Sequence, residues 1–546
     1  MCGIYGYFQL NQASKKKISL KKRQQLFLEF SKTQHRGPDH SIFKSIDNNT
    51  ILGFHRLCIV GIEDGNQPFY KNNVYCICNG EIYNHKELRT KYNLPTCTGS
   101  DCEVILHLFL KFGIEKTCTL LDGVFAFLLY DTNTYNIYIG RDRIGVRSLY
   151  YNLDSSDNIL CVSSEMKSIG NKSRCEFFPP GSYAIYAHNT LHINSYYITT
   201  YNNPTYKFDT FEVAMRQTRY YFEKAIQKRL MSERPIGCLL SGGLDSSLVA
   251  ALVAKIIAPK RLHTFSIGMK GATDLYYAKM VATHINSIHH EVYVTKEEML
   301  NTLPRTVYSI ESWDTTTVRA STPMILLCDY IKEKTDITVI YSGEGSDEAS
   351  GSYMYFHNAP STKTFQNECV RLVKDLQYFD VLRSDKSVSA AGLEVRVPFL
   401  DNEFLEYYMS ISPEYKQPSK NKNIEKYLLR KAFDDGKLLP KEVLWRTKEA
   451  FSDGCSSQED SWNEIIQKYT DSMTFDNSLL KNCEHPPEFK EAMYYRQEFL
   501  KHFPDNVDII PYYWLPKWSG DVKDPSARIL DVYSTDSSLN QLKSTS

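Results

Sequence analysis

The chain has 546 residues, of which 42% are hydrophobic, and its 64 Lys and Arg balance 64 Asp and Glu, so the formal net charge is zero. This length exceeds what a single hydrophobic core supports, so two or three domains are expected. The balanced charge excludes a general electrostatic attraction to nucleic acid or to an anionic membrane surface.

The chain begins MCGIYGYF, with a cysteine directly behind the initiator methionine. Because Cys2 is small, aminopeptidase removal of Met1 could expose it as the first residue. Its free α-amine, with a pKa of about 8, would then be partly neutral and could act as a base for its own thiol. Such a nucleophile suits amide cleavage, whereas the alternative is an ordinary buried cysteine on a first strand. This stretch alone leaves both interpretations open.

Residues 1–200 are dominated by short runs of β-forming residues with helical periodicity between them. The run at 14–25 is locally basic, and we interpret it as a solvated helix face rather than a nucleic-acid or targeting patch. Several runs are apolar on both faces, as in stacked sheets, while CEVILHLFLKF (102–112) has helical spacing. The pattern predicts an α+β sandwich. The expected strands lie in CGIYGYF, ILGFHRLCIV, NVYCICNGEIYN, GVFAFLLYD, YNIYIGRD and NILCVSSE.

The pattern changes at residues 201–210, which are polar, contain a proline and are predicted to form a linker. Beyond them apolar strands alternate with helices, as where PIGCLLSGG leads into LDSSLVAALVAKI, and RLHTFSIGMKG, HHEVYVT and ITVIYSGEG follow. Such alternation predicts a parallel sheet with helices on both faces. Helical patterns dominate after about residue 360, and the polar residues 531–546 are expected to be a disordered tail.

Other features favour an intracellular protein. The start lacks the charged region and long apolar core of a secretory leader. The most apolar helical stretch, 247–258, is too short to span a bilayer and contains Lys255. The 14 cysteines show no repeated metal-ligand spacing, so we expect reduced thiols and a cytoplasmic location. Cys76 and Cys78 would share one face of a strand, which suits packing better than a metal site.

The strongest local signal is LLSGGLDSS (239–247), in which an apolar strand turns through Ser-Gly-Gly directly into a helix. The glycines allow a ligand to approach the backbone, and the helix N-terminus offers N–H groups and the positive end of its dipole. This favours a pyrophosphate-binding loop over a plain capped helix, although no Walker GK[ST] follows. Asp245 inside an anion site requires a cation, for which Mg²⁺ with a nucleotide is the natural choice.

A second loop, VIYSGEGSDEASG (339–351), repeats this pattern at the end of another strand. Asp347 could share a metal ion with Asp245, and Glu344 is a carboxylate free for proton transfer. Two such loops on neighbouring strands would define a crevice at one edge of the sheet.

These motifs together indicate a family. SGGLDSS resembles the PP-loop of the ATP pyrophosphatases, which adenylate a substrate and release pyrophosphate, and the MCGI start resembles class II glutamine amidotransferases of the N-terminal-nucleophile (Ntn) type. In this order the two halves resemble the glutamine-hydrolysing asparagine synthetases, from residue 2 to about residue 530. The further motifs that carry the resemblance are RGPD (36–39), NGEIYN (79–84), GSDCEV (99–104), TTTVRASTPM (315–324), SGEGSDE (342–348), LEVRVPFLD (393–401) and WRTKEAFSDG (445–454).

The resemblance implies an αββα Ntn-type glutaminase domain over 2–200 and a parallel-sheet PP-loop synthetase domain with a helical extension over 211–530. In the first domain, Cys2 would attack the side-chain amide of glutamine, while Asn79 and Gly80 would donate hydrogen bonds to the oxyanion. A cationic fork would hold the α-carboxylate of glutamine and two acidic side chains its α-amine. The implied glutamine-binding residues are Arg56, Leu57, Cys58, Ile59, Val60, Asn79, Gly80, Glu81 and Asp101.

In the second domain, the resemblance implies that the β-carboxylate of aspartate attacks ATP to give β-aspartyl-AMP and pyrophosphate. Ammonia would then displace AMP. Glu344 would take a proton from the attacking ammonia, and Lys448 would offset the charge of the phosphates. Asp245 and Asp347 would hold Mg²⁺. The implied ATP-binding residues are Leu240, Ser241, Gly242, Gly243, Asp245, Ser246, Ile267, Ser342 and Gly343.

The resemblance also implies an internal ammonia tunnel and a homodimer, with no nucleic-acid or membrane partner. The chain departs from the family in SGSY (350–353), where Gly-Gly-Tyr is frequent, and in Ser148, where proline is common. Three alternatives remain. A β-lactam-forming synthetase would lack the nucleophilic cysteine, an amino-sugar amidotransferase would lack SGGLDSS, and a degenerate binding protein would have lost some implied catalytic residues. This chain keeps all of them.

Overall fold

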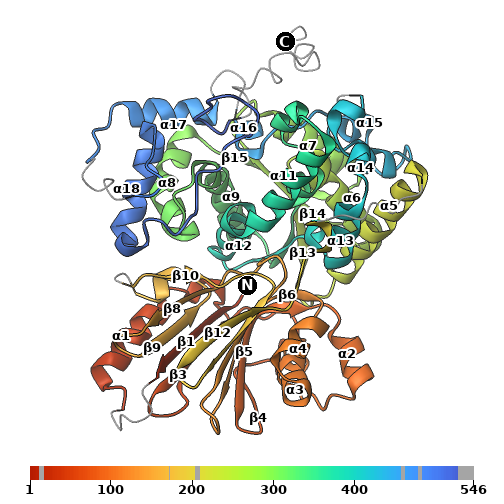
Figure 1. Ribbon diagram of the computed structural model, residues 1–546. Coiled ribbons are helices and arrows are strands. Elements are labelled where there is room, and N and C mark those ends of the chain that lie inside the picture. Colours follow the sequence, from red (N-terminus) through yellow and green to blue (C-terminus); the bar gives the residue numbers. More distant parts are fainter. Residues whose placement is uncertain are drawn as a thin grey trace.

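The computed structural model describes residues 1–10, 17–170, 173–202, 210–422, 424–456, 461–476 and 483–526. Two bodies are visible, one built on sheets and coloured red to yellow, the other rich in helices and coloured green to blue (Figure 1). The N-terminus lies where the two bodies meet (Figure 1). Most of the linker expected at 201–210, and all of the tail expected at 531–546, lie outside the described residues.

The N-terminal domain contains two six-stranded antiparallel sheets. In spatial order, the first sheet consists of β10 (Glu176–Phe177), β8 (Tyr150–Asp154), β9 (Ile159–Ser163), β1 (Gly3–Gln9), β3 (Thr50–Arg56) and β2 (His40–Ser45). The second consists of β12 (Thr190–Ser195), β11 (Ser182–Ala187), β7 (Ile137–Arg141), β6 (Gly123–Asp131), β5 (Val74–Ile82) and β4 (Phe69–Lys71). Each expected strand run is therefore found as a strand.

Buried side chains from both sheets form one core, in which Ile4 and Phe8 of β1 join Ile77 and Leu128 of the second sheet. Helix α1 (Leu20–Ser31) covers the outer face of the first sheet. Helices α2 (His85–Tyr92), α3 (Glu103–Phe112) and α4 (Ile114–Leu120) cover the second. The layers are thus helix, sheet, sheet and helix, which confirms the expected αββα sandwich.

The locally basic run and the strand cysteines have the structures expected of them. Ser19 caps α1 by accepting the backbone N–H of Lys22 at 3.2 Å, so the run continues into a helix, although residues 14–16 lie outside the described part. Cys76 and Cys78 both pack into the core between the second sheet and its helices. All 14 cysteines of the chain are free thiols.

The C-terminal domain is built on a five-stranded sheet whose strand pairs are all parallel. In spatial order its strands are β15 (Ile288–Tyr293), β14 (His263–Gly268), β13 (Ile236–Leu239), β16 (Val339–Tyr341) and β17 (Glu394–Arg396). The first four were expected, whereas β17 is too short to show a pattern. The strand order reverses between β13 and β16, and both Gly/Ser-rich loops follow these strands. In a parallel sheet the crevice outside such a reversal point is where ligands bind.

Helices cover both faces of the parallel sheet, with α5 and α6 on one side and α8, α9 and α12 on the other (Figure 1). Among the described residues no helix has both the length and the apolar character needed to cross a membrane. The helices are α5 (Phe211–Lys228), α6 (Leu244–Ile257), α7 (Thr273–His284), α8 (Lys296–Ile310), α9 (Thr315–Lys334), α10 (Ser346–Ser350), α11 (Thr362–Asp375), α12 (Asp380–Ser389), α13 (Asn402–Ser410), α14 (Tyr427–Ala432), α15 (Lys441–Leu444), α16 (Phe451–Gly454), α17 (Trp462–Asp471) and α18 (Lys490–His502).

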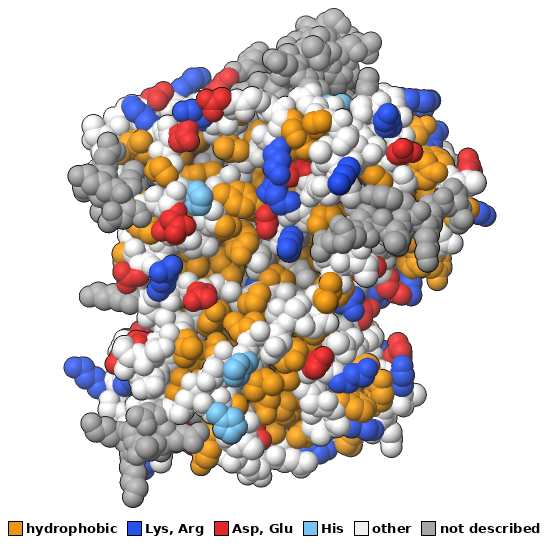
Figure 2. Space-filling model, in the orientation of Figure 1, with side chains coloured by type: hydrophobic (Ala, Val, Ile, Leu, Met, Phe, Trp, Pro, Cys, Tyr) orange, Lys and Arg blue, Asp and Glu red, His pale blue; other side chains and the backbone are white. Residues whose placement is uncertain are grey.

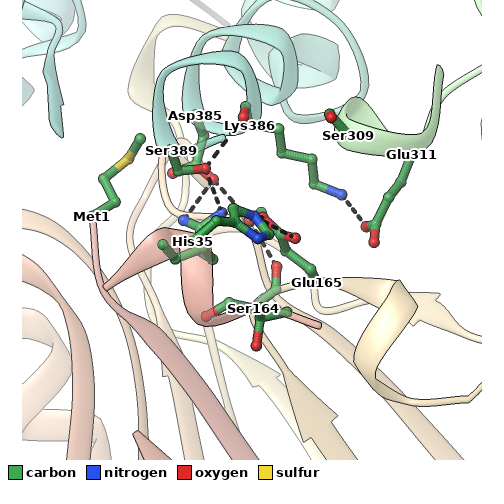
Figure 3. Close-up of polar contacts among 12 residues, drawn as sticks. Met1, His35, Ser164, Glu165, Ser309, Glu311, Asp385, Lys386 and Ser389 are labelled. Carbon is green, nitrogen blue, oxygen red and sulfur yellow. Dashed lines mark hydrogen bonds and ion pairs between the residues drawn. The ribbon is translucent and has the colours of Figure 1, made fainter. Parts of the chain in front are cut away.

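The two domains meet through buried charged side chains. The guanidinium of Arg36 in the N-terminal domain contacts Glu165 at 2.7 Å and reaches across to Asp385 of α12 at 2.9 Å. Lys386 of the same helix pairs with Glu311, and neither side chain is exposed. Figure 3 shows Lys386 extending toward Glu311, with Asp385 and Ser389 of the C-terminal domain facing the N-terminal residues His35 and Glu165. Charges removed from water in this way require close partners of opposite sign.

Glu311 uses its whole carboxylate in this interface. One oxygen accepts the backbone N–H of Lys167 at 2.7 Å and the other accepts that of Met166 at 2.9 Å, both in the N-terminal domain. Its backbone adopts a left-handed conformation (φ 54°), which is uncommon for a residue with a side chain. Ser148, which differs from the family pattern, also joins the interface because its hydroxyl donates to Asp385 at 2.9 Å.

We expect Glu311→Gln to weaken the interface. The substitution leaves the buried Lys386 ammonium without its anionic partner, at a cost of about 3 kcal/mol. The midpoint of thermal unfolding should fall by several degrees, and the amides of Met166 and Lys167 should exchange with deuterium faster. Glu297→Gln, at an exposed position of α8, the helix that ends directly before Glu311, serves as the control. Equal unfolding midpoints in the two variants would contradict this account.

Candidate functional sites

The first candidate site surrounds Cys2 at the edge of the N-terminal domain. A small cavity of about 30 Å³ is lined by Cys2, Arg56, Gly80, Glu81 and Asp101, among others. Leu57, Ile59 and Val60 also line it, whereas the backbone N–H of Cys58 bonds to Asp39 at 2.8 Å. The backbone N–H of Leu57 points at the Cys2 sulfur at 3.4 Å. Most of the residues expected around glutamine are thus brought together.

Asn79 and Gly80 lie side by side on β5, close to this cavity. Asn79 is buried, yet within the described residues neither its Nδ2 nor its Oδ1 has a hydrogen-bond partner. A buried amide without partners is costly, which is consistent with a group that awaits a ligand. At position 80 a Cβ would lie 2.3 Å from the carbonyl oxygen of Val124, so only glycine lets β5 and β6 approach this closely.

The charged residues of the first site are only partly free for a ligand. Arg56 donates to the carbonyl of Ile62 at 3.1 Å and to Asn66 at 2.8 Å, so its fork already contacts a loop. Glu81 forms an ion pair with Arg396 of the C-terminal domain at 3.2 Å. The Asp101 carboxylate accepts the backbone N–H of Ile82 at 2.6 Å. Burial raises the pKa of Asp101 to about 6 and that of Glu81 well above its usual value.

Met1 lies beside Cys2 and contacts the second domain. It is fully buried, and its amine donates to the carbonyl of Leu393 at 2.9 Å. Burial lowers the pKa of this amine to about 5. Burial also raises the pKa of the Cys2 thiol to about 12, so the thiol requires a base to become a nucleophile. With Met1 present the nitrogen of Cys2 is an amide and cannot be that base.

The second candidate site lies at the carboxyl ends of β13 and β16. A cavity of about 180 Å³ is lined by residues of both Gly/Ser-rich loops and by the start of α6. Ser241 and Ser246 face each other with their hydroxyl oxygens 3.0 Å apart. Gly242 has φ 76°, and a Cβ there would lie 2.4 Å from the backbone nitrogen of Ala278, so this turn requires glycine. The expected residues that line the cavity are Leu240, Ser241, Gly243, Asp245, Ser246, Ile267, Ser342, Gly343, Glu344, Asp347 and Lys448.

Two aspartates in this cavity share cationic partners. Lys426 places its ammonium 2.5 Å from an oxygen of Asp245 and 2.5 Å from an oxygen of Asp347. Lys448 contacts the other oxygen of Asp347 at 2.6 Å. Although burial alone would raise the pKa of Asp347, the two ammonium groups hold it well below its usual value. Lys426 was missed in the sequence because no motif contains it. Ser352, a departure from the family pattern, donates to Asp347 at 2.5 Å.

The donor set around this pair fits a magnesium ion. A cation already sits between Asp245 and Asp347, in the form of the Lys426 ammonium. Within the described residues no group of three or more His, Cys, Asp or Glu forms a cage for a metal. Mg²⁺ is commonly held by one or two carboxylates together with the phosphates of a substrate, which is what two aspartates beside a phosphate loop can offer.

Glu344 lies in a separate group of acidic side chains in the same cavity. Arg383 contacts Glu344 at 2.5 Å and Asp380 at 2.8 Å. Burial raises the pKa of Glu344, although Arg383 opposes the shift. The pKa of Glu348 is raised well above its usual value by burial and by nearby Asp380. A carboxylate with a raised pKa is suited to accept a proton near neutral pH.

An apolar cluster lies between the two sites. It contains Leu57 and Ile59 of the N-terminal domain and Val339 of β16, with Cys2 and Ile236 packed against it. The cluster therefore joins the surroundings of the thiol to the two strands that carry the phosphate-binding loops. No motif indicates this contact, because it forms only when the domains dock.

Comparisons with known proteins agree with both halves of the chain. Residues 1–197 match the family model of a glutamine amidotransferase domain, and residues 217–368 and 358–519 match that of asparagine synthase. The chain is 43% identical to "Asparagine synthetase [glutamine-hydrolyzing]" of Gallus gallus, with 98% of this chain and 99% of that protein aligned. The proteins of the same name from Rattus norvegicus and Homo sapiens are each 42% identical, over the same shares of the two chains.

We expect the reactivity of Cys2 to depend on removal of Met1. With Met1 in place, a thiol pKa of about 12 leaves little thiolate at pH 8, so alkylation by iodoacetamide should be slow. Once Met1 is removed, the adjacent free amine should raise the rate by at least tenfold, or about one pKa unit. Mass spectrometry of both forms measures this rate, and the exposed Cys97 provides the internal reference. Equal rates of alkylation at Cys2 in the two forms would contradict this dependence on Met1 removal.

Proposed function

The chain belongs to the glutamine-hydrolysing asparagine synthetases and makes asparagine from aspartate, glutamine and ATP, and we propose that its two cavities divide this reaction between them. The observation that carries this division is the pair of cavities on either side of one domain interface, one around Cys2 and one at β13 and β16. We assign the glutaminase domain to residues 2–200, the linker to 201–210 and the synthetase domain to 211–530.

In the glutaminase domain, the Cys2 thiol attacks the side-chain amide of glutamine after Met1 has been removed. The freed α-amine takes the proton of the thiol and later delivers one to the departing ammonia. The unpartnered amide of Asn79 and the backbone N–H of Gly80 stabilise the oxyanion of the tetrahedral intermediate. Asp101 holds the α-amine of glutamine, and Arg56 holds its α-carboxylate once its fork leaves the loop that it now contacts.

Ammonia then passes between the domains instead of through water, where it would be protonated and lost. The apolar cluster of Leu57, Ile59 and Val339 supports this route, because it offers a dry path from Cys2 toward the parallel sheet. The buried Arg36–Asp385 ion pair, which crosses the interface, helps to keep the two domains in register.

In the synthetase domain, the serine hydroxyls and the N-terminus of α6 cradle the phosphates of ATP. The β-carboxylate of aspartate attacks the α-phosphorus, and β-aspartyl-AMP and pyrophosphate form. Adenylation is needed because a carboxylate oxygen is a poor leaving group until it is bonded to phosphorus. Ammonia then attacks the activated carbonyl, and AMP departs.

Three groups of the cavity support this chemistry. Mg²⁺ held by Asp245 and Asp347 would neutralise phosphate charge during adenylation. Glu344, whose pKa is raised by burial, accepts the proton of the attacking ammonia. Lys448 contacts Asp347 at 2.6 Å in the lining of this cavity, and its ammonium offsets the negative charge of the phosphates.

We further propose that the chain acts in the cytoplasm as a homodimer. Helix α1 exposes Leu20, Phe27 and Leu28, of which Leu20 is 73% exposed, and a second copy could cover this apolar surface. Lys and Arg are scattered among Asp and Glu on the face shown in Figure 2, which offers no uniform basic surface for nucleic acid. The free state of all 14 cysteines is compatible with a reducing compartment.

The reaction can be tested by incubating the protein with Mg·ATP, aspartate and amide-¹⁵N glutamine. We expect ¹⁵N-labelled asparagine in an amount that matches the pyrophosphate released, because both sites and the passage between them would then be working. Pyrophosphate without labelled asparagine would place the failure in the Cys2 site or in the passage. If well-folded protein gave neither product, the proposed division of the reaction would be wrong.

The substitution Asn79→Ala tests whether the two sites carry separate activities. Loss of one oxyanion donor should lower the rate of glutamine hydrolysis by about 100-fold or more. Asparagine synthesis from free ammonia should stay unchanged, because the β13 and β16 cavity is untouched. Parallel assays of glutamate and asparagine check this expectation, and an equal loss in both would show that the substitution damages the fold.

A further inference from the structure

Lys426 has contacts that no proposed role yet explains. Its side chain is almost fully buried, and its ammonium lies between Asp245 and Asp347, at 2.5 Å from an oxygen of each. These are the carboxylates assigned to Mg²⁺, one from each of the two phosphate-binding loops. The ammonium therefore occupies the gap in which a divalent cation would bind both carboxylates.

The backbone of Lys426 is held in a fixed position by its neighbours. Its backbone is left-handed (φ 59°), a conformation that a residue with a side chain adopts at a cost and that is concentrated at functional sites. The preceding residue, Glu425, is buried and accepts the backbone N–H of Lys448 at 2.8 Å. Arg430 of α14 donates to the Glu425 carbonyl at 2.8 Å and to the Lys426 carbonyl at 2.9 Å. One buried pair thus fixes the backbones of both lysines.

A metal ion and the ammonium cannot share the gap between the two carboxylates. Both are cations, and at such short range their repulsion would be large in a cavity shielded from water. A lysine side chain has a flexible four-carbon stem, so its ammonium can move while its backbone stays fixed. The phosphate-binding loops lie beside the gap, so the phosphates of a bound nucleotide would offer the displaced ammonium a new anionic partner.

We propose that Lys426 is a removable counter-ion: it holds Asp245 and Asp347 together while the site is free of Mg·ATP, yields the gap to the metal, and then binds the pyrophosphate group. This inference rests on the proposed magnesium site. In the free enzyme the ammonium prevents two carboxylates from repelling each other beside the phosphate loop. When Mg·ATP is bound, the Lys426 ammonium pairs with the phosphates instead. The carboxylates and the phosphates therefore each have a cationic partner.

The first test measures metal binding without nucleotide. Lys426→Met removes the competing ammonium and keeps most of the length of the side chain. We expect it to bind Mn²⁺ about tenfold more tightly than the unchanged protein, as measured by electron paramagnetic resonance in the absence of ATP. Lys431→Met is the matched control, since Lys431 lies on α14, which begins directly after Lys426, is half-exposed and pairs with Asp434 outside the cavity. Unchanged or weaker Mn²⁺ binding by Lys426→Met would overturn the counter-ion role.

The second test measures binding of pyrophosphate. In Lys426→Met, inhibition of asparagine synthesis by added pyrophosphate should weaken by about tenfold, because a charged hydrogen-bond donor is lost. Lys426→Arg keeps the charge and should restore much of that inhibition. An unchanged inhibition constant in Lys426→Met would show that the ammonium does not reach the phosphates.

Glutamine hydrolysis by Cys2 does not use this cavity, so equal glutaminase rates confirm that each variant is folded. Failure of the magnesium proposal itself has a different signature. The unchanged protein and both Lys→Met variants would then bind Mn²⁺ equally weakly, and Asp245→Asn would leave Mn²⁺ binding as it was.

Discussion

Burial of charge at the domain interface is the constraint on which the rest of the molecule depends. Arg36, Glu165, Asp385, Glu311 and Lys386 are all buried, and their charges pair with one another within and across the two domains. Separation of the domains would break the Arg36–Asp385 ion pair and would take from Glu311 the backbone N–H groups of Met166 and Lys167, and breaking a buried ion pair costs several kcal/mol. The interface therefore keeps the two domains in one relative orientation, and with them the two cavities and the apolar cluster between the cavities.

Local sequence predicted the parts of the molecule that short segments determine. The strand, glycine turn and helix of the phosphate loop are contiguous, and so are Cys2 with its strand and Asn79 with Gly80. The family resemblance then supplied their expected roles. Glu311, Arg383 and Lys426 were missed because their partners lie far away in the sequence; Lys426 and Asp245 are separated by 181 residues. Their importance arises from tertiary contacts, which no spacing of residues within a motif reveals.

The larger cavity contains acidic side chains of two kinds. Asp347 has a lowered pKa because two ammonium groups outweigh its burial, so it remains a carboxylate. The pKa of Glu344 is raised because burial outweighs Arg383, and that of Glu348 because burial and the nearby Asp380 act in the same direction. Neighbouring groups with opposite shifts can perform different tasks at one pH, such as holding a cation and exchanging a proton. This division is a property of the folded cavity, since the same residue types have nearly the same pKa values in an unfolded chain.

The burial of Met1 also limits when Met1 can be removed from the chain. Its amine is bonded to the carbonyl of Leu393, which lies 392 residues further along the chain. A ribosome adding about 5–20 residues per second needs roughly 20–80 s to make that stretch. During this interval the N-terminus has left the ribosome while the surface that will enclose it does not yet exist. An aminopeptidase can therefore reach Met1 before the second domain folds. A chain that still carries Met1 when that domain folds keeps it, because Met1 is then buried.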